Sequence, residues 1–170
     1  MPPNQDTESV RGAVLSAPDT QSAVWFVGAL VQMRITGAET GGQFAVLEHT
    51  GRRGYSTPLH VHAAADELFV VIEGQLKFVS DGEEFAAGPG ASVWLPRGTH
   101  HAVMGTSDEF RYLNFHYPAG FEDFVREIGT PAPELAVPPP QGPPSPELMK
   151  ALTESAGRHG MTILGPPPQP

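Results

Sequence analysis

The sequence predicts an all-β fold, a jelly-roll barrel of the double-stranded β-helix type, followed by short C-terminal helices. Short apolar runs alternate with turn residues from residue 23 onward, at the spacing typical of a sandwich or barrel. No segment between residues 23 and 117 has a long helical period. Glycine and proline, 19 of each, are common, and many lie in the turns between the runs. An antiparallel barrel accounts for this pattern.

The expected strands are short apolar runs bounded by turn residues. In chain order they cover residues 24–27, 29–31, 44–48, 68–72, 76–79, 92–95, 101–104 and 110–117. Asp81-Gly82 is a favoured two-residue hairpin turn, because glycine readily adopts the positive φ that such turns need. The pattern therefore predicts hairpin-connected strands.

Two helices are expected after the strands. Apolar residues at i, i+3, i+4 and i+7 predict a helix over residues 121–128, which Gly129 ends. Ser145 and Pro146 predict the N-cap and first position of a second helix that ends near Gly157.

We expect three parts in the chain. Residues 1–22 have little apolar content, which predicts a flexible N-terminal arm. Residues 23–129 form the barrel domain, and residues 130–170 a proline-rich linker with a helical tail. Met1 to Gly12 lacks the features of a signal peptide, and no apolar run approaches the ~18–20 residues of a membrane span. We therefore expect a cytoplasmic protein without membrane contact.

Composition excludes several classes of site and partner. Cysteine is absent, which excludes disulfides, iron–sulfur clusters, thiolate zinc sites and cysteine nucleophiles. The formal net charge is −9, from 19 acidic and 10 basic residues, without a basic cluster. Such a surface repels phosphate backbones, so we expect no nucleic acid partner.

His60 and His62 are two residues apart. On a strand, both side chains leave the same face, about 6.6–6.8 Å apart along the chain. Two imidazoles at this spacing can converge on one metal ion, and a solvated strand face is the alternative.

Glu67 follows His62 by five residues, so strict alternation places it on the opposite face. It joins the histidines only if the chain bends within residues 63–66, which are mostly alanine. Glu67 then shares a face with Phe69 and Val71. An ionised carboxylate on such a buried face costs several kcal/mol unless it is paired or metal-bound. The cost of burying the Glu67 carboxylate is offset either by a metal ion or by a salt bridge to an arginine.

Two segments of the chain resemble the two motifs of the cupin family. The first segment is Gly54-x5-His60-x-His62-x4-Glu67-x6-Gly74, and the second is Gly90-x5-Pro96-x-Gly98-x2-His101. Gly105 stands where the family pattern has asparagine, at a turn position rather than a ligand position. The resemblance is strongest over residues 54–105. Segments 24–25, 40–42, 118–122 and 160–167 are similar to small single-domain cupins of the quercetin (flavonol) dioxygenase-like group.

The resemblance implies that His60, His62, Glu67 and His101 bind one divalent transition metal ion. Three nitrogens and one oxygen do not select among iron, nickel, zinc, manganese, cobalt and copper. An octahedral ion would keep two positions for water, dioxygen or substrate, as catalytic sites do. Glu67 is also the candidate catalytic base. His100 is the alternative to His101, which the second-motif spacing favours.

The remaining histidines have less specific interpretations. His116 shares a strand face with Tyr112 and Asn114, from which it can contact a metal ligand or substrate. We favour an exposed or hydrogen-bonded histidine there. His49 and His159 are expected at the surface.

Four aromatic residues are candidates for the lining of a substrate cavity: Phe44, Phe69, Phe78 and Trp94. A place in the ordinary core is the favoured interpretation for each. Leu68, Val70 and Ile72 form a second apolar face of their strand, directed away from the metal. The other sheet, the tail or a second subunit must cover it, and we expect a homodimer.

The resemblance implies a metal-dependent oxidoreductase, a dioxygenase that acts on a small aromatic or enol-containing, flavonol-like molecule. Two alternatives stay open. One is a metal-dependent but non-oxidative cyclase or isomerase of polyketide-type substrates, and the other is a non-catalytic cupin that binds a small molecule.

Overall fold

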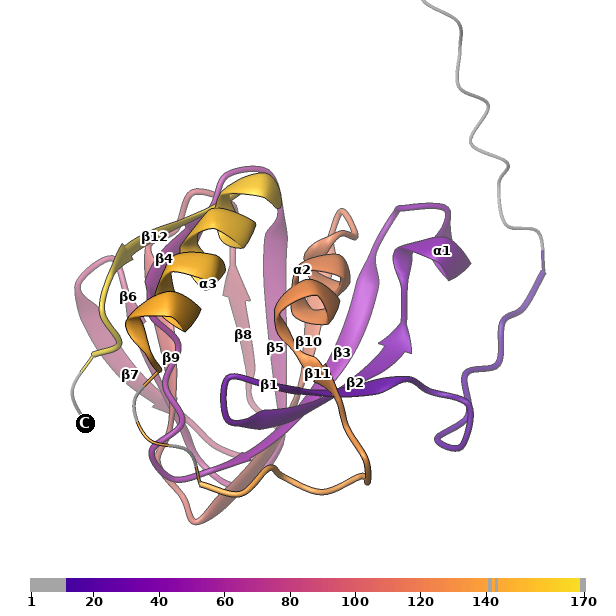
Figure 1. Cartoon of the computed structure of the whole chain (residues 1–170), viewed down its shortest axis with the longest axis horizontal. Helices are drawn as coiled ribbons and strands as arrows, with labels where there is room; N and C mark the ends of the chain where they lie inside the picture. Colours follow the sequence, from indigo (N-terminus) through magenta and orange to yellow (C-terminus); the bar gives the residue numbers. More distant parts are fainter. Residues whose placement is uncertain (1–11, 141, 143, 169–170) are drawn as a thin grey trace, which may run out of the picture.

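The computed structural model describes residues 12–140, 142 and 144–168 (Figure 1). Two antiparallel sheets face each other, with short helices packed beside them. The predicted all-β jelly roll is therefore confirmed. Within the described residues, the sheets are not hydrogen-bonded to each other as one closed barrel.

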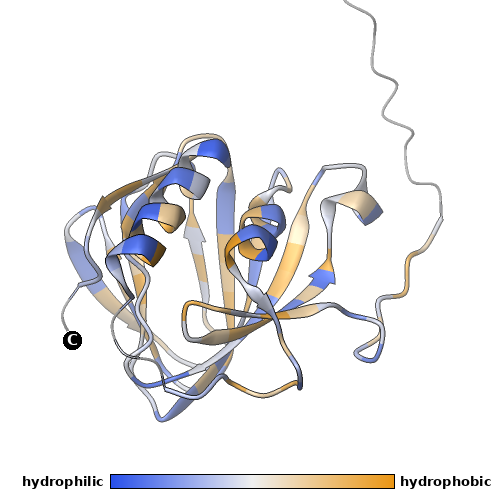
Figure 2. Cartoon of the chain, in the orientation of Figure 1, coloured by the Kyte–Doolittle hydropathy of each residue, from blue (hydrophilic) through white to orange (hydrophobic). Residues whose placement is uncertain are grey.

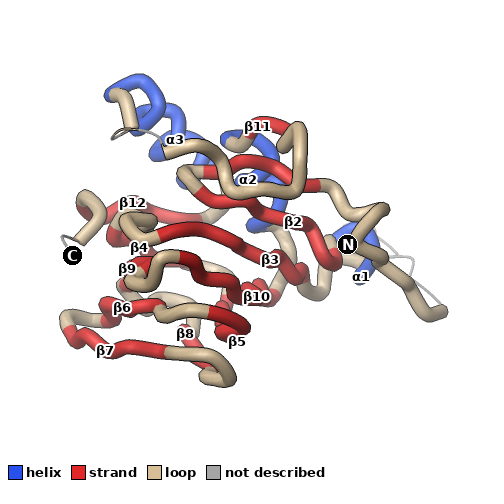
Figure 3. Tube along the Cα trace, turned by 90° about the horizontal axis from the view of Figure 1, so that it is seen from below, coloured by secondary structure: helices blue, strands red, loops and turns tan. Residues whose placement is uncertain are grey.

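The two sheets differ in size. The seven-stranded sheet has the order β11 (Thr130–Pro131), β1 (Ala23–Phe26), β2 (Ala29–Ile35), β3 (Ala45–Arg52), β10 (Glu109–Tyr117), β5 (Asp66–Glu73) and β8 (Ser92–Leu95). The five-stranded sheet has the order β12 (Met161–Gly165), β4 (Leu59–His62), β9 (His101–Gly105), β6 (Leu76–Ser80) and β7 (Glu83–Ala87) (Figure 3).

The strand β5 shows how alternation separates the inside from the outside. Glu67, Phe69 and Val71 are buried, with 3%, 3% and 1% of their surface exposed. Leu68 and Val70 between them are half-buried, on the outer face. The second apolar face predicted for this strand is therefore present.

The hairpin between β6 and β7 has the predicted turn. Asp81 and Gly82 both have positive φ, at 47° and 87°, and Ser80 pairs with Glu83 across the turn. The strand β7 itself was not predicted, because four of its five residues are exposed and it lacks an alternating apolar pattern. It is an edge strand, whose residues need little burial.

The two predicted helices are confirmed as α2 (Phe121–Ile128) and α3 (Pro146–Arg158). The Ser145 hydroxyl accepts a hydrogen bond from the Leu148 amide at 3.2 Å, so the expected N-cap is present. Figure 2 shows α3 banded in hydrophilic and hydrophobic colours, as expected for a helix with one buried side. None of the described helices is long and apolar enough to cross a membrane.

Three short elements were not predicted. One is the helix α1 (Gly37–Thr40), where the Glu39 carboxylate accepts a hydrogen bond from the Thr36 amide at 2.7 Å. The other two are β11, which pairs with β1, and β12, which pairs with β4. The strand β12 has five residues and lies between a glycine turn and a run of prolines, so the sequence contains little pattern that predicts it.

The C-terminal residues therefore lie against the domain. Met161 pairs with His62, and Ile163 pairs with His60 (Figure 3). The division of the chain at residues 22 and 129 stays a prediction, and the first half of the expected N-terminal arm lies outside the described residues.

Two of the four aromatic predictions were wrong. Trp94 is 56% exposed and Phe44 is 39% exposed, so neither belongs to the core or lines a cavity. Trp94 lies on β8 opposite Leu68, and an outward position there follows from the alternation. Phe69 and Phe78 are core residues, with their ring centroids 5.2 Å apart.

Candidate metal centre

Three of the four predicted ligands come from neighbouring strands of the smaller sheet. His60 and His62 lie on β4 and His101 begins β9, where it pairs in register with His60. The ring centroids of His60 and His101 are 4.3 Å apart, and those of His60 and His62 are 5.1 Å apart. Strand alternation and strand pairing thus bring three imidazoles together.

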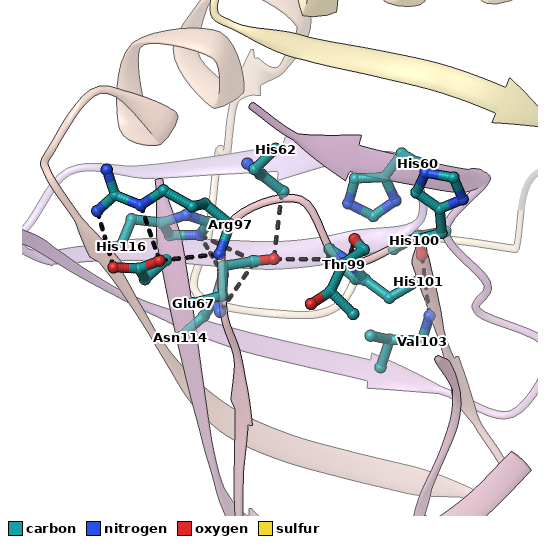
Figure 4. Close-up of polar contacts among 12 residues, drawn as sticks. His60, His62, Glu67, Arg97, Thr99, His100, His101, Val103, Asn114 and His116 are labelled. Carbon is teal, nitrogen blue, oxygen red and sulfur yellow. Dashed lines mark hydrogen bonds and ion pairs between the residues drawn. The ribbon is translucent and has the colours of Figure 1, made fainter. Parts of the chain in front are cut away.

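The fourth residue, Glu67, comes from the larger sheet. The strand β4 ends at His62 and β5 begins at Asp66, so a loop over residues 63–65 carries the chain from one sheet to the other. The bend required for Glu67 to reach the histidines is therefore present (Figure 4).

The structure decides between the alternatives for Glu67. Its ion pairs among the described residues are with His62, His101 and His116. Arg97 pairs with Asp66, the residue next to Glu67, at 2.8 Å instead. A salt bridge between Glu67 and an arginine was thus the wrong alternative.

The four side chains form one compact cluster. One ligand atom from each of His60, His62, Glu67 and His101 lies within 4.8 Å of the others. The Oε2 atom of Glu67 is 2.8 Å from His101 Nε2 and 3.2 Å from His62 Nε2. None of these three buried atoms makes a hydrogen bond of normal geometry with the described residues. His100, the alternative ligand, is exposed and lies outside the cluster.

Backbone carbonyls orient two of the rings. His60 Nδ1 lies 2.8 Å from the Pro58 oxygen, and His101 Nδ1 lies 2.9 Å from the Thr99 oxygen. A carbonyl only accepts, so each Nδ1 carries the hydrogen and donates it. Each Nε2 then keeps its lone pair, directed into the cluster.

A transition metal ion fits this arrangement. Bonds of about 2.0–2.2 Å place ligand atoms at most about 4.4 Å apart. A maximum separation of 4.8 Å therefore needs side-chain adjustments of only a few tenths of an ångström. The buried atoms without a hydrogen bond, all nitrogen or carboxylate oxygen, are of the type such ions accept.

The pKa shifts of His60, His62 and Glu67 also suit a metal ion. Burial lowers the pKa of His60 to about 3 and lowers that of His62. Burial alone would raise the pKa of Glu67, but His62, His116 and His101 together hold it well below its ordinary value. Burial also opposes protonation of His101, yet the adjacent Glu67 carboxylate raises the pKa of His101. Neutral imidazoles and an ionised carboxylate are the forms that coordinate metals.

His116 is hydrogen-bonded rather than exposed, and it contacts the candidate ligand Glu67. It is fully buried, at 0% exposed, and its Nε2 lies 3.3 Å from Glu67 Oε1 and 2.5 Å from Asn114 Oδ1. The Asn114 amide donates to Glu67 Oε1 at 3.3 Å (Figure 4). The prediction that Tyr112, Asn114 and His116 share a strand face is confirmed, and the structure shows that this face is buried.

The surface location predicted for His49 was wrong. It is 2% exposed and stacks on Tyr112, with ring centroids 4.8 Å apart. Burial lowers its pKa to about 3, and neither ring nitrogen has a partner among the described residues. The alternation of residues 45–49, with Leu47 inward, was the signal that could have placed it inside. His159 is half-buried and lies 2.8 Å from Glu127.

Gly105 departs from the family pattern for a steric reason. A Cβ atom at this position would lie 2.2 Å from the ring of Phe110, much closer than a real contact. Any larger residue, including asparagine, would require this buried aromatic ring to move.

Residues 47–115 match the family model described as the cupin domain. The chain contains a cupin domain. The matched segment contains all four residues of the cluster.

A curated relative is quercetin 2,3-dioxygenase from Bacillus subtilis (strain 168). The cupin is 33% identical to it over 100 residues, which make up 58% of this chain and 30% of that protein. The match thus spans less than a third of the relative's length. The relative is an enzyme, which supports an enzymatic function for this cupin in general terms.

Solved structures support the fold. KdgF from Halomonas sp. superposes with a TM-score of 0.56 at 16% identity, covering 63% of this cupin and 94% of that chain. PAC13 from Streptomyces, solved with uridine, has a TM-score of 0.54 at 15% identity. The match covers 64% of this chain and 84% of that chain. At this identity, the likeness shows that the architecture is shared.

Proposed function

We propose that this cupin is a metal-dependent oxidoreductase, a dioxygenase that acts on a small aromatic or enol-containing, flavonol-like molecule. The observation that carries this proposal is the convergence of His60, His62, Glu67 and His101, with buried ligand atoms that lack hydrogen-bond partners. The sequence likeness to quercetin 2,3-dioxygenase favours oxygen chemistry over the non-oxidative alternatives.

The roles of the residues follow from their atoms. His60, His62 and His101 would hold the ion through Nε2, and Glu67 would hold it through Oε2. A bound divalent transition metal would favour the deprotonated form of a substrate enol or phenol and supply redox chemistry with dioxygen. When Glu67 does not hold the ion, its Oε2 would accept the hydroxyl proton of the substrate, while Asn114 holds its other oxygen at 3.3 Å.

The first prediction concerns metal content and oxygen uptake in the same preparations. We expect about one transition-metal ion per wild-type chain by elemental analysis, and metal-dependent oxygen consumption with quercetin or a simple flavonol. His62→Ala should lose both, because it removes a ligand. His100→Ala is the matched control, since His100 is an exposed neighbour of the cluster, and it should retain both.

Equal metal content in the wild-type and His62→Ala proteins would overturn the ligand assignment. Metal-dependent conversion of an enol-containing substrate without oxygen uptake would instead place the protein in the non-oxidative class of cyclases and isomerases. Tight binding of the flavonol without turnover would identify a non-catalytic binding protein.

We also propose a homodimer formed through the outer face of the larger sheet. Phe115 pairs with Leu68, and Leu68 pairs with the exposed Trp94, so three large apolar side chains form one row. Leu113 and Val70 form a parallel row beside it. A second copy would cover this surface.

We expect the protein to act in the cytoplasm on a small molecule, without nucleic acid as a partner. The expectation about nucleic acid rests on the net charge of −9, which repels phosphate backbones.

A further inference from the structure

Two adjoining cavities lie on the side of the domain that the C-terminal residues cover. The smaller one, about 50 Å³, reaches the ring of His60. The larger one, about 450 Å³, does not reach His60, but the two share Val27, Tyr55 and Leu152 among their walls. The larger cavity therefore adjoins the metal centre through the smaller one. Its volume lies in the range of small-molecule sites.

The walls of the larger cavity are mostly apolar and come from two distant parts of the chain. One wall is Val27 in the turn between β1 and β2. The opposite wall is the C-terminal segment, with Val137, Leu148 and Leu152 and several prolines. Figure 1 shows α3 and β12 together on this side, beside β4. Such walls suit the apolar body of a ligand rather than a sugar or a phosphate ester.

The charged side chains of this cavity are both cationic. Arg52 and Arg53 line it, and the described lining residues include no acidic side chain. The guanidinium of Arg53 is already bound to Asp108, at 3.1 Å and 3.2 Å. Among the residues that the structure describes, the one ion pair of Arg52 is a distant contact of 4.0 Å with the exposed Glu109. In a chain of net charge −9, Arg52 thus remains available to an anion beside apolar walls.

We propose that the larger cavity binds a small apolar acid, with its anionic group on Arg52 and its apolar end directed through the smaller cavity toward His60. Arginine suits this role because its planar guanidinium binds carboxylates and other oxyanions with two parallel hydrogen bonds. The direction toward His60 rests on the proposed function, since it matters only if His60 belongs to a reactive centre. The binding of the acid itself does not depend on a metal.

The test uses two aromatic probes that differ in charge. We expect 8-anilinonaphthalene-1-sulfonate, an anion, to bind the wild-type protein at one site per chain with a rise in fluorescence. Arg52→Gln should raise its dissociation constant about tenfold, because a charge-assisted hydrogen bond is lost. The neutral N-phenyl-1-naphthylamine should bind the wild-type and Arg52→Gln proteins equally. Arg126→Gln, an exposed arginine on α2 outside both cavities, is the matched control.

A second variant tests the apolar walls. Leu148→Trp places a larger side chain at the cavity and should weaken both probes, while circular dichroism remains that of the wild type. The proposal is overturned if Arg52→Gln binds the anion as the wild type does, or if Arg126→Gln loses as much affinity. It is also overturned if Leu148→Trp binds both probes like the wild type.

The His62→Ala variant separates this inference from the proposed function. It should lose the metal ion and still bind the anionic probe with unchanged affinity. If the wild-type protein carries no metal but Arg52-dependent binding persists, the proposed function fails and the acid site stands. If metal and turnover are present without Arg52-dependent binding, the acid site fails alone.

Discussion

At the scale of single residues, the position of Glu67 is controlled by side chains that do not belong to the cluster. His116 Nε2 faces two acceptors, Asn114 Oδ1 and Glu67 Oε1, so this nitrogen carries the hydrogen. The Asn114 amide then donates to Glu67 Oε1 and leaves Oε2 directed at His62 and His101. Asn114 is therefore a positioning residue for the candidate ligand.

Replacement of Asn114 by leucine, which has a similar volume, should weaken metal binding about 10–100-fold, as the loss of a hydrogen bond to a ligand typically does. The measurement is a competition titration with a chelator. Leu113→Ala, on the outer face of the same strand, should keep the wild-type affinity. The thermal midpoint without metal separates a structural defect from a positioning effect. Wild-type affinity in Asn114→Leu would show that Glu67 needs no such support.

At the scale of elements, one carboxylate joins the two C-terminal helices. Glu127 on α2 lies 2.8 Å from His159 Nε2 and is also paired with Arg158 at the end of α3. The hydrogen bonds from His159 and Arg158 lower the pKa of Glu127 to about 2. This contact holds α3 in the place where it forms a wall of both cavities.

The pH dependence of stability should reveal this contact. The pKa of Glu127 is lower in the folded state than its ordinary value of 4.5. The stability that it contributes is therefore complete above about pH 4.5 and is lost as the pH falls toward 2. Between pH 5 and pH 2, the thermal midpoint should fall less in Glu127→Gln than in the wild type. Glu154→Gln, an exposed change on α3, should follow the wild type, and parallel curves for all three proteins would contradict the role of Glu127.

At the scale of the whole molecule, the proposed homodimer would form through the outer face of the larger sheet. Its row of Phe115, Leu68 and Trp94 lies on the side of the sheet opposite Glu67. Association through this face would leave the metal centre and the two cavities within each subunit.

Trp94→Lys should convert the dimer to a monomer, because it places a charge in the middle of the apolar contact. Light scattering coupled to size-exclusion chromatography measures the change, with a fall from the mass of two chains to that of one. Leu135→Lys alters another exposed apolar residue, 58% exposed and outside the strands, and should remain a dimer. A wild-type protein with the mass of one chain would refute the dimer.

The local pattern of the sequence was sufficient to predict many of the strands, turns and buried faces of this protein. The alternation of side chains along a strand is a property of the chain itself, so residues that share a face could be assigned from the sequence. The inner set of Glu67, Phe69 and Val71, the turn at Asp81 and the N-cap at Ser145 were all predicted in this way. The candidate ligands could be identified because their residue types and spacing follow a known motif.

Only the tertiary structure decided which faces meet. The partner of Glu67, for example, could not be chosen from the sequence between an arginine and the histidines. The placement of α3 and β12 beside β4, and with it the cavity that contains Arg52, also depends on contacts between segments far apart in sequence. Such contacts form because distant apolar faces leave water together, and the sequence of either segment alone does not specify its partner.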